Sequence, residues 1–132
     1  MDEYVKGWIT KAKRDLKVAE HELGLPKEDI ITDAVCFHCQ QAVEKFLKAY
    51  LASKNLDFGK THNLEYLIEL CFKNDPEFKS IVLGNLSFYA VEIRYPDEFY
   101  TPSLNEAEES FQIAIDVKNF VLKKLGIDKD IS

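Results

Sequence analysis

The hydrophobic residues within residues 33–53 recur at intervals of three and four positions, which is the period of an α-helix. They are Val35, Cys39, Ala42, Val43, Phe46, Ala49 and Tyr50, with Phe37, Leu47 and Leu51 widening the apolar surface. A helix with so wide an apolar surface must be largely buried. We therefore expect this helix to lie at the centre of the fold.

A narrow row of polar residues runs beside the apolar surface of this central helix. Its members are three or four positions apart and so lie on one side of the helix: His38, Gln41, Lys45 and Lys48. A polar row in that place is typical of a helix that meets a partner or a ligand.

Similar patterns predict a helix before the central one and another after it. Hydrophobic residues at helical spacing cover residues 2–23, and the pattern stops at Gly24 and Pro26 because glycine terminates helices and proline cannot continue one. After the central helix, Thr61 or Asn63 can cap a third helix. The expected core positions of the third helix are Leu64, Leu67, Ile68, Cys71 and Phe72.

A fourth helix is expected to begin at Asp75 and Pro76, which suit the N-cap and the first helical position. Its hydrophobic positions at helical spacing are Phe78, Ile81, Val82, Leu86, Tyr89 and Ile93. Gly84 is a point at which this helix can kink or break, and Pro96 ends it.

The last long helix is expected after Ser103, because Ser103 and Glu106 have the spacing of a capping box. Gly126 closes this helix. No segment alternates with the period of a strand. The sequence therefore predicts an all-α, up-and-down bundle of four to five helices, with one domain over residues 1–126 and a flexible tail over residues 127–132.

Charge and hydropathy argue against two classes of function, general binding to duplex nucleic acid and insertion in a membrane. The net charge of −6 disfavours general binding to duplex nucleic acid, because such binding grows with the number of phosphates that lysine and arginine neutralise. It leaves room for a small basic pocket. No apolar run reaches the length of a membrane span, and the acidic, amphipathic N-terminus has no secretory signal. We therefore expect a cytoplasmic protein without membrane contact.

The cysteines raise the question of a metal site, since Cys36 and Cys39 have the C-x-x-C spacing at which two thiolates can share a zinc ion. The sequence has no second pair of this kind, and a redox pair needs a βαβ context that the pattern lacks. Cysteines on an apolar helix are more often small core residues. We expect Cys36, Cys39 and Cys71 to be free thiols, and we expect no metal and no cofactor.

Two residues near helix ends are candidates for contact with phosphate. His62 lies just before a helix start, where it either holds a phosphate, acts as an acid or base, or only satisfies local backbone groups. Arg94 precedes Tyr95, Pro96 and Asp97, so a rigid turn holds a guanidinium beside an aromatic ring and a carboxylate. The guanidinium either grips a phosphate or pairs with the last helix carbonyls and the neighbouring acids. The residues alone leave these alternatives open.

Three motifs resemble the HEPN domain proteins of bacteria and archaea. In chain order they are C-F-H-C-Q-Q-A-V-E-K-F-L-K-A-Y-L in the central helix, T-H-N-L at the next helix start, and E-I-R-Y-P-D at the end of the fourth helix. The resemblance implies a four- or five-helix bundle that forms a homodimer. It also implies a role beside a small nucleotidyltransferase, often as a toxin and antitoxin pair or in a related nucleotide-dependent system.

The ribonuclease motif of this family is incomplete here. HEPN ribonucleases resemble one another in an Arg followed four to six residues later by a His, a pair that cleaves RNA without metal. Arg94 stands at the Arg position, but residues 95–101 contain no His. We therefore favour a nucleotide-binding, regulatory homodimer over an enzyme. The alternative is a metal-independent ribonuclease that combines Arg94 with a displaced histidine, His62 or His38.

The favoured function predicts a shared polar surface. We expect Arg94 and its turn to face a groove that receives a nucleotide such as ATP or an adenylate, an RNA phosphate, or the active site of a nucleotidyltransferase. The loop tyrosines Tyr95 and Tyr100 are candidate acceptors of an adenylate from such a partner. The ligand-binding residues predicted for this surface are Gln41, Lys45, Lys48, His62, Arg94, Tyr95 and Asp97.

Overall fold

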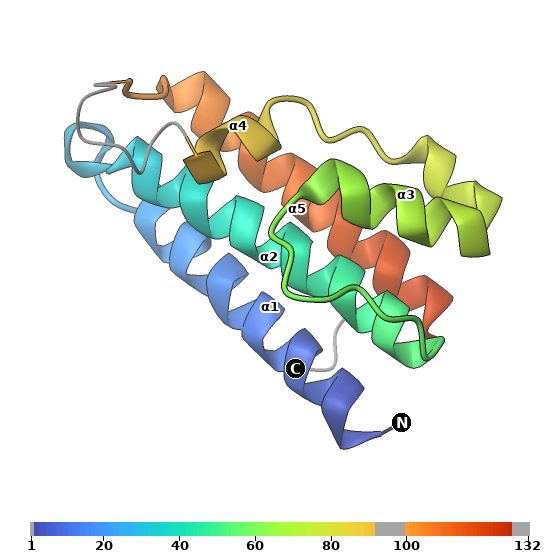
Figure 1. Ribbon diagram of the computed structural model, residues 1–132. Coiled ribbons are helices and arrows are strands. Elements are labelled where there is room, and N and C mark those ends of the chain that lie inside the picture. Colours follow the sequence, from blue (N-terminus) through green and yellow to red (C-terminus); the bar gives the residue numbers. More distant parts are fainter. Residues whose placement is uncertain (1, 92–99, 128–132) are drawn as a thin grey trace.

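The computed structural model describes residues 2–91 and 100–127, and in these ranges its regular secondary structure is all helical (Figure 1). Its elements are α1 (Glu3–Leu23), the 3₁₀ turn η1 (Lys27–Asp29), α2 (Thr32–Ser53), α3 (Leu64–Asn74), the 3₁₀ turn η2 (Pro76–Ser80), α4 (Leu86–Val91) and α5 (Leu104–Lys124). The all-α prediction is confirmed. None of the described helices is long and apolar enough to cross a bilayer. The predicted tail, apart from Ile127, lies outside the described residues.

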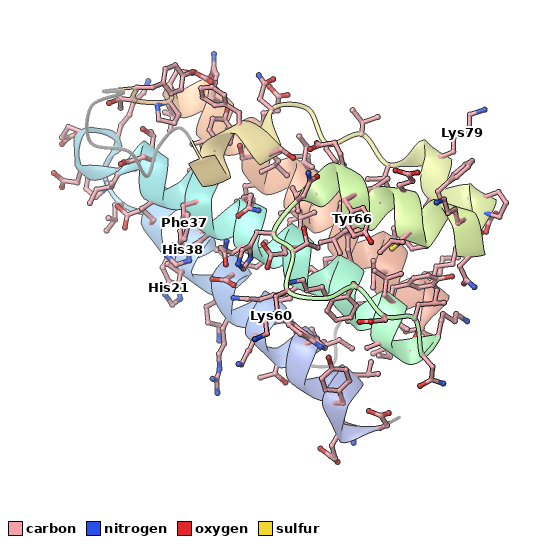
Figure 2. All side chains as sticks on the ribbon, in the orientation of Figure 1. His21, Phe37, His38, Lys60, Tyr66 and Lys79 are labelled. Carbon is pink, nitrogen blue, oxygen red and sulfur yellow. The ribbon has the colours of Figure 1, made fainter. Side chains whose placement is uncertain are left out.

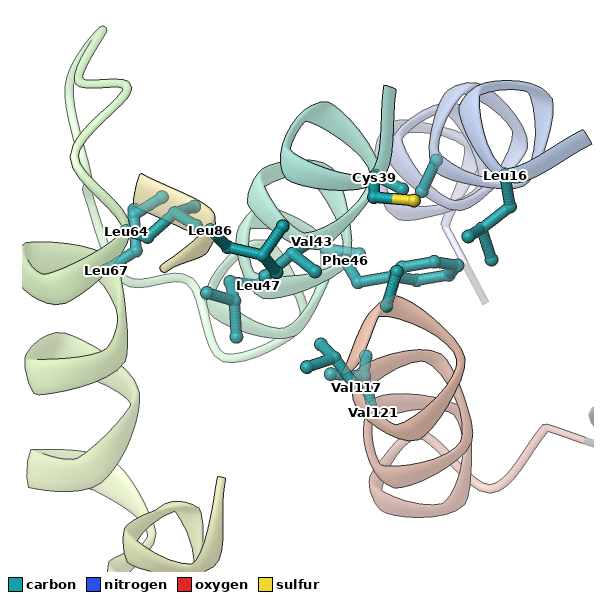
Figure 3. Packing of buried hydrophobic residues seen from close by; sticks show 14 of the residues in the cluster. Leu16, Cys39, Val43, Phe46, Leu47, Leu64, Leu67, Leu86, Val117 and Val121 are labelled. Atoms are coloured by element: carbon teal, nitrogen blue, oxygen red, sulfur yellow. The ribbon is translucent and has the colours of Figure 1, made fainter. Parts of the chain in front are cut away.

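The central position predicted for α2 is confirmed. α1 runs beside α2, α5 packs on α2 from another side, and the shorter α3 and α4 cover more of its apolar surface (Figure 1). In Figure 3, Phe46 extends from α2 over α5 toward Leu16 of α1, while Leu47 points toward Leu64 of α3 and Leu86 of α4. All seven hydrophobic residues expected to recur along this helix are buried.

Side-chain caps explain where several helices begin. The Asp2 carboxylate accepts a backbone hydrogen bond of 3.0 Å from the first turn of α1, and the Asn63 side chain does the same for α3 at 3.0 Å. Asn63, rather than Thr61, is thus the cap of α3. The capping box predicted for α5 is confirmed, because Ser103 and Glu106 each accept a hydrogen bond from the other's backbone N–H. A cap of this kind contributes about 1 kcal/mol of stability.

The start of α2 is tied to the segment that leads into α5. The Thr32 hydroxyl donates a hydrogen bond of 2.7 Å to the carbonyl oxygen of Pro102. Further along the same two helices, the Ser110 hydroxyl lies 3.5 Å from the Cys36 sulfur in the core. These contacts fix the position of α5 along α2.

The predicted start at Asp75 and Pro76 is confirmed, because Asp75 caps η2 and Pro76 lies in its first turn, but η2 is a short 3₁₀ turn and not the first half of a longer α-helix. A 3₁₀ turn over Pro76–Ser80 is followed by an irregular segment in which Val82 is 74% exposed, and only then does α4 begin. The cause is Gly84, whose φ of +55° is left-handed, and whose backbone lies so close to α5 that an added Cβ would be 3.1 Å from the Ile113 side chain. Ile93, the last predicted core position of this helix, lies outside the described residues.

Phe72 is also placed wrongly by the pattern. It is exposed, whereas Leu64, Leu67 and Cys71 of the same helix are fully buried. α3 is short and meets the bundle along one narrow stripe, so a hydrophobic residue one position past that stripe faces solvent.

Candidate functional site

The described part of the predicted polar surface consists of α2 and the loop before α3. Gln41, Lys45 and Lys48 belong to α2, and His62 belongs to the loop that crosses α2 before α3 begins. Figure 2 shows His38 on the side of α2 next to α1, and Lys60 on the crossing loop. Three predicted members of the surface, Arg94, Tyr95 and Asp97, lie outside the described residues.

The most unusual polar feature of the described chain is a buried ion pair on α2. Glu44 and Lys48 are one turn apart, 2% and 4% exposed, and the Lys48 Nζ lies 3.1 Å from a Glu44 oxygen. The same Nζ lies 5.3 Å from the centre of the Trp8 ring and 5.6 Å from the centre of the Phe58 ring, which is within cation–π range. Desolvating two charges costs about as much as their attraction returns, so a buried pair is weak evidence of a purely structural role.

His62 connects this buried pair to the surface. Its Nδ1 lies 3.0 and 3.2 Å from the two oxygens of Glu44, and its side chain is 71% exposed. Because an ionised carboxylate only accepts hydrogen bonds, Nδ1 carries the hydrogen and Nε2 is directed away from the pair. The loop itself is held in place, since Thr61 accepts a hydrogen bond from the Asn63 backbone at 3.1 Å and Asn63 caps α3. The imidazole is therefore oriented before any ligand arrives.

A second charged cluster joins α2 to α1. Asp15 of α1 accepts hydrogen bonds from Lys45 at 2.5 Å and from His38 at 2.9 Å, one on each carboxylate oxygen. All three side chains are partly buried. Lys45 thus has a carboxylate partner on the neighbouring helix.

Two adjacent glutamines lie one turn before Glu44 and Lys45. The Gln41 amide donates a hydrogen bond of 2.8 Å to the side-chain oxygen of Gln40. Gln40 is fully buried, and within the described residues its Nε2 has no hydrogen-bond partner. A buried donor without a partner is costly, so this amide lowers the stability of the core.

The structure divides the predicted polar row between two clusters. Lys48 and His62 meet at Glu44, whereas Lys45 and His38 meet at Asp15. Sequence reasoning missed the residues at the centre of each cluster, together with Gln40, Trp8 and Phe58. Glu44 had a detectable signal, because a Glu four residues before a Lys on a helix is a favourable pair. Asp15 had none, since it belongs to another helix.

Each lysine of the row is therefore matched by a carboxylate, and the outward-facing group is the imidazole of His62. A neutral imidazole can take a proton from a hydroxyl, and a protonated one can donate a hydrogen bond to a phosphate oxygen. No group of three or more His, Cys, Asp or Glu that can hold a metal is found in the described part of the chain.

The cysteines are free thiols in the core, as expected. Burial raises the pKa of Cys36 to about 11 and that of Cys71 to about 12. It also raises the pKa of Cys39 well above its usual range. All three are consequently protonated and inert as nucleophiles near neutral pH.

Tyr100, one of the two candidate adenylate acceptors, is exposed, but its hydroxyl is occupied. It donates a hydrogen bond to Glu106, which also accepts one of 3.0 Å from the buried Tyr89. The hydrogen bond to Glu106 raises the pKa of Tyr100, because it stabilises the protonated phenol. The other candidate, Tyr95, lies outside the described residues.

Comparison with known proteins gives a family assignment. The family model described as HEPN domain matches residues 5–125, a range that includes α2, both charged clusters and nearly all of α1 and α5. The searches among curated proteins and among solved structures gave no match. By the extent of the family-model match, the chain belongs to the HEPN domain family.

Proposed function

We propose that this protein is a regulatory HEPN homodimer that binds a nucleotide or an RNA phosphate and acts with a small nucleotidyltransferase. Membership of the HEPN family supports a function related to nucleotides or RNA. The observation on which the proposal rests is the exposed imidazole of His62, held by the buried carboxylate of Glu44.

The charge balance of the cluster supports phosphate binding at His62. Glu44 alone would repel an anion, but Lys48 neutralises it at 3.1 Å. A protonated His62 then adds one positive charge, with its Nε2 hydrogen available to a phosphate oxygen. In a chain with a net charge of −6, such a position is favourable for an anion because most of the surface repels one.

Arg94 is the second group of the proposed site. A guanidinium offers two parallel N–H donors to a phosphate, and this geometry gives specificity as well as affinity. The proposal therefore requires both His62 and Arg94, and it makes the two testable separately.

The direct test is calorimetric titration of the wild type with AMP, ATP and a short single-stranded RNA. We expect His62→Ala and Arg94→Ala each to weaken binding roughly tenfold or more, because each removes a charge-assisted hydrogen bond. The control is His21→Ala, which removes an exposed histidine of α1 outside both clusters. Unchanged affinity in both site variants would refute the proposed site. Absence of binding heat with all three ligands would refute the nucleotide-binding function.

The partnership needs its own experiment. The protein is mixed with a candidate nucleotidyltransferase and ATP, and the intact mass of the chain is followed. We expect stable co-elution, and if a loop tyrosine accepts an adenylate, a mass increase that is lost in Tyr100→Phe or Tyr95→Phe but kept in the control Tyr66→Phe. Independent elution without a change in mass would contradict the partnership.

The second candidate function is metal-independent RNA cleavage, and the Glu44–His62 hydrogen bond favours it. A carboxylate that accepts a hydrogen bond from Nδ1 of a histidine fixes the tautomer and the orientation of the ring, as in many catalytic histidines. In this reading His62 acts as the acid or base and Arg94 holds the phosphate. Purified protein that cleaves RNA in the presence of a chelator, with loss of cleavage in His62→Ala and Arg94→Ala but not in His21→Ala, would support it.

A further inference from the structure

A surface recess on α1 has Trp8, which contacts the buried ion pair, among its lining residues. Its volume is about 250 Å³ and it is lined by Glu3, Tyr4, Gly7, Trp8 and Lys11. These residues are three or four positions apart, so they form one face of the helix. None of them belongs to the two charged clusters, but Trp8 contacts Lys48 and so connects the recess to the Glu44–His62 network.

Gly7 forms the floor of the recess. Glycine is the poorest helix former apart from proline, yet Gly7 lies inside α1 and does not have a positive φ. A Cβ added at Gly7 would have no atom within 4 Å, so the protein's own packing does not require a glycine there. What the glycine provides is bare helix backbone that a flat molecule can approach closely.

Two aromatic rings form the wall of the recess. Tyr4 is 60% exposed, and its ring meets the Trp8 ring edge to face, with centroids 6.1 Å apart. The Trp8 ring is held from its other side by Phe58, at a centroid distance of 5.8 Å, and by the ammonium group of Lys48. Trp8 is thus fixed in place, whereas Tyr4 is free to adjust to a ligand.

The chemistry of the recess suits a planar heteroaromatic ring that carries a negative group. Bases stack on tyrosine and tryptophan without regard to sequence, and the exposed Lys11 adds a positive charge at one end of the recess. The volume is slightly below the roughly 300 Å³ at which drug-sized pockets begin, so it fits one ring system.

We propose that this recess binds the base of a nucleotide, by stacking on Tyr4 and Trp8 over the bare backbone of Gly7. The inference rests on the proposed function. It assigns a binding site to the base of the nucleotide, which the His62 cluster does not contact.

Trp8 is the only tryptophan of the chain, so tryptophan fluorescence reports on the surroundings of this one ring. We expect AMP and adenosine to quench the emission of the wild type saturably, and ribose 5-phosphate, which lacks the base, to leave it unchanged. Tyr4→Ala should raise the dissociation constant roughly tenfold, because one stacking partner is lost. The control is Tyr66→Ala, which removes a similarly exposed tyrosine from α3.

Gly7→Ala is the most informative variant. Alanine is a better helix former than glycine, so a loss of binding in this variant would not be caused by unfolding. Alanine should raise the melting temperature by about 3–5 °C, as expected for a better helix former at an exposed position, while it weakens AMP binding roughly tenfold by occupying the floor of the recess. Val18→Ala provides the control, since it also places a better helix former at an exposed position of α1, three turns away. It should leave AMP binding unchanged.

The outcomes separate this inference from the proposed function. Binding heat with AMP that is the same in wild type, Tyr4→Ala and Gly7→Ala would overturn the inference and leave the proposed function standing. Quenching that depends on Tyr4 and Gly7 but not on His62 or Arg94 would support the inference and refute the proposed phosphate site. Neither heat nor quenching with any nucleotide would overturn both.

Discussion

The carboxylate of Glu44 and the ammonium group of Lys48 are 3.1 Å apart in a part of the core that water hardly reaches. Removing Glu44 leaves Lys48 buried without a carboxylate, and removing Lys48 leaves Glu44 buried with only the exposed His62 as a partner. We predict that Glu44→Gln and Lys48→Met each lower the free energy of unfolding by about 3–5 kcal/mol, whereas the double variant Glu44→Leu/Lys48→Met is close to the wild type. Urea denaturation of the four proteins measures this, and additive losses in the double variant would contradict it.

Glu106 should make the protein less stable as the pH falls into the acid range. Its pKa lies below the usual range because its carboxylate accepts hydrogen bonds, first from the Ser103 backbone and then from the hydroxyls of Tyr100 and Tyr89. A carboxyl whose folded pKa is lowered stabilises the fold above its unfolded pKa of about 4.3 and loses that contribution as pH falls through the folded pKa.

Glu106→Gln should therefore destabilise the protein by about 0.5–1 kcal/mol at pH 7, and the difference from wild type should be smaller at pH 3. Denaturation at the two pH values checks this, with the exposed Glu108→Gln as the control. An equal difference at both pH values would show that shape, and not charge, is what matters at this position.

The three thiols should react only after unfolding. With pKa values raised to about 11 and about 12 at Cys36 and Cys71, and raised further at Cys39, almost no thiolate exists at pH 8. We expect no fast reaction of the native protein with a disulfide reagent, and three equivalents after denaturation. Lys60→Cys, on an exposed loop, should add one fast equivalent. We also expect no stoichiometric zinc by elemental analysis.

Gly84→Ala should act in the opposite direction from an alanine on the exposed face of α1. The new Cβ would require a positive φ and would lie 3.1 Å from Ile113, so we predict a loss of about 1–2 kcal/mol in the free energy of unfolding. Adding Ile113→Val, which shortens the opposing side chain, should recover part of that loss. No loss in Gly84→Ala would mean that this segment rearranges easily.

The predicted homodimer can be tested by measuring the mass of the protein in solution. Phe88 and Tyr100 stack edge to face at 5.3 Å and are both substantially exposed, which leaves an apolar patch available to a second copy. Light scattering should give twice the mass of one chain at micromolar concentration. Phe88→Glu should shift the mass toward the monomer, while Val18→Glu on α1 should not. A monomer mass for the wild type at every concentration would refute the dimer.

Features set by neighbouring residues were predictable from the sequence, and features set by distant ones were not. The Ser103–Glu106 capping box and the buried face of α2 follow from local spacing, and both are confirmed. The break near Gly84 depends on how closely α5 approaches it, and no local pattern records that distance. The sequence marked Gly84 as a point where the helix can kink or break, but it did not show that the segment before Gly84 forms only a 3₁₀ turn.

The candidate site shows the same division. The row on α2 was recognisable as polar, and the loop position of His62 was recognisable as a helix start. That Lys45 would bind Asp15, thirty positions earlier, was not recoverable, because it depends on how α1 and α2 pack. Glu44 was overlooked because a carboxylate next to Val43 and Phe46 is expected to face solvent, and only its two partners explain its burial.

The packing of α2 against both α1 and α5 also bears on how the chain folds. α1 and α2 are consecutive and joined by a short turn, so their contacts close a small loop and can form within microseconds to milliseconds. The contact of Thr32 with Pro102 closes a loop of about seventy residues and must form later. We expect amide hydrogen exchange to be slowest in the α1–α2 hairpin, and the rate-limiting step of folding to be the docking of α5 onto a hairpin that already exists.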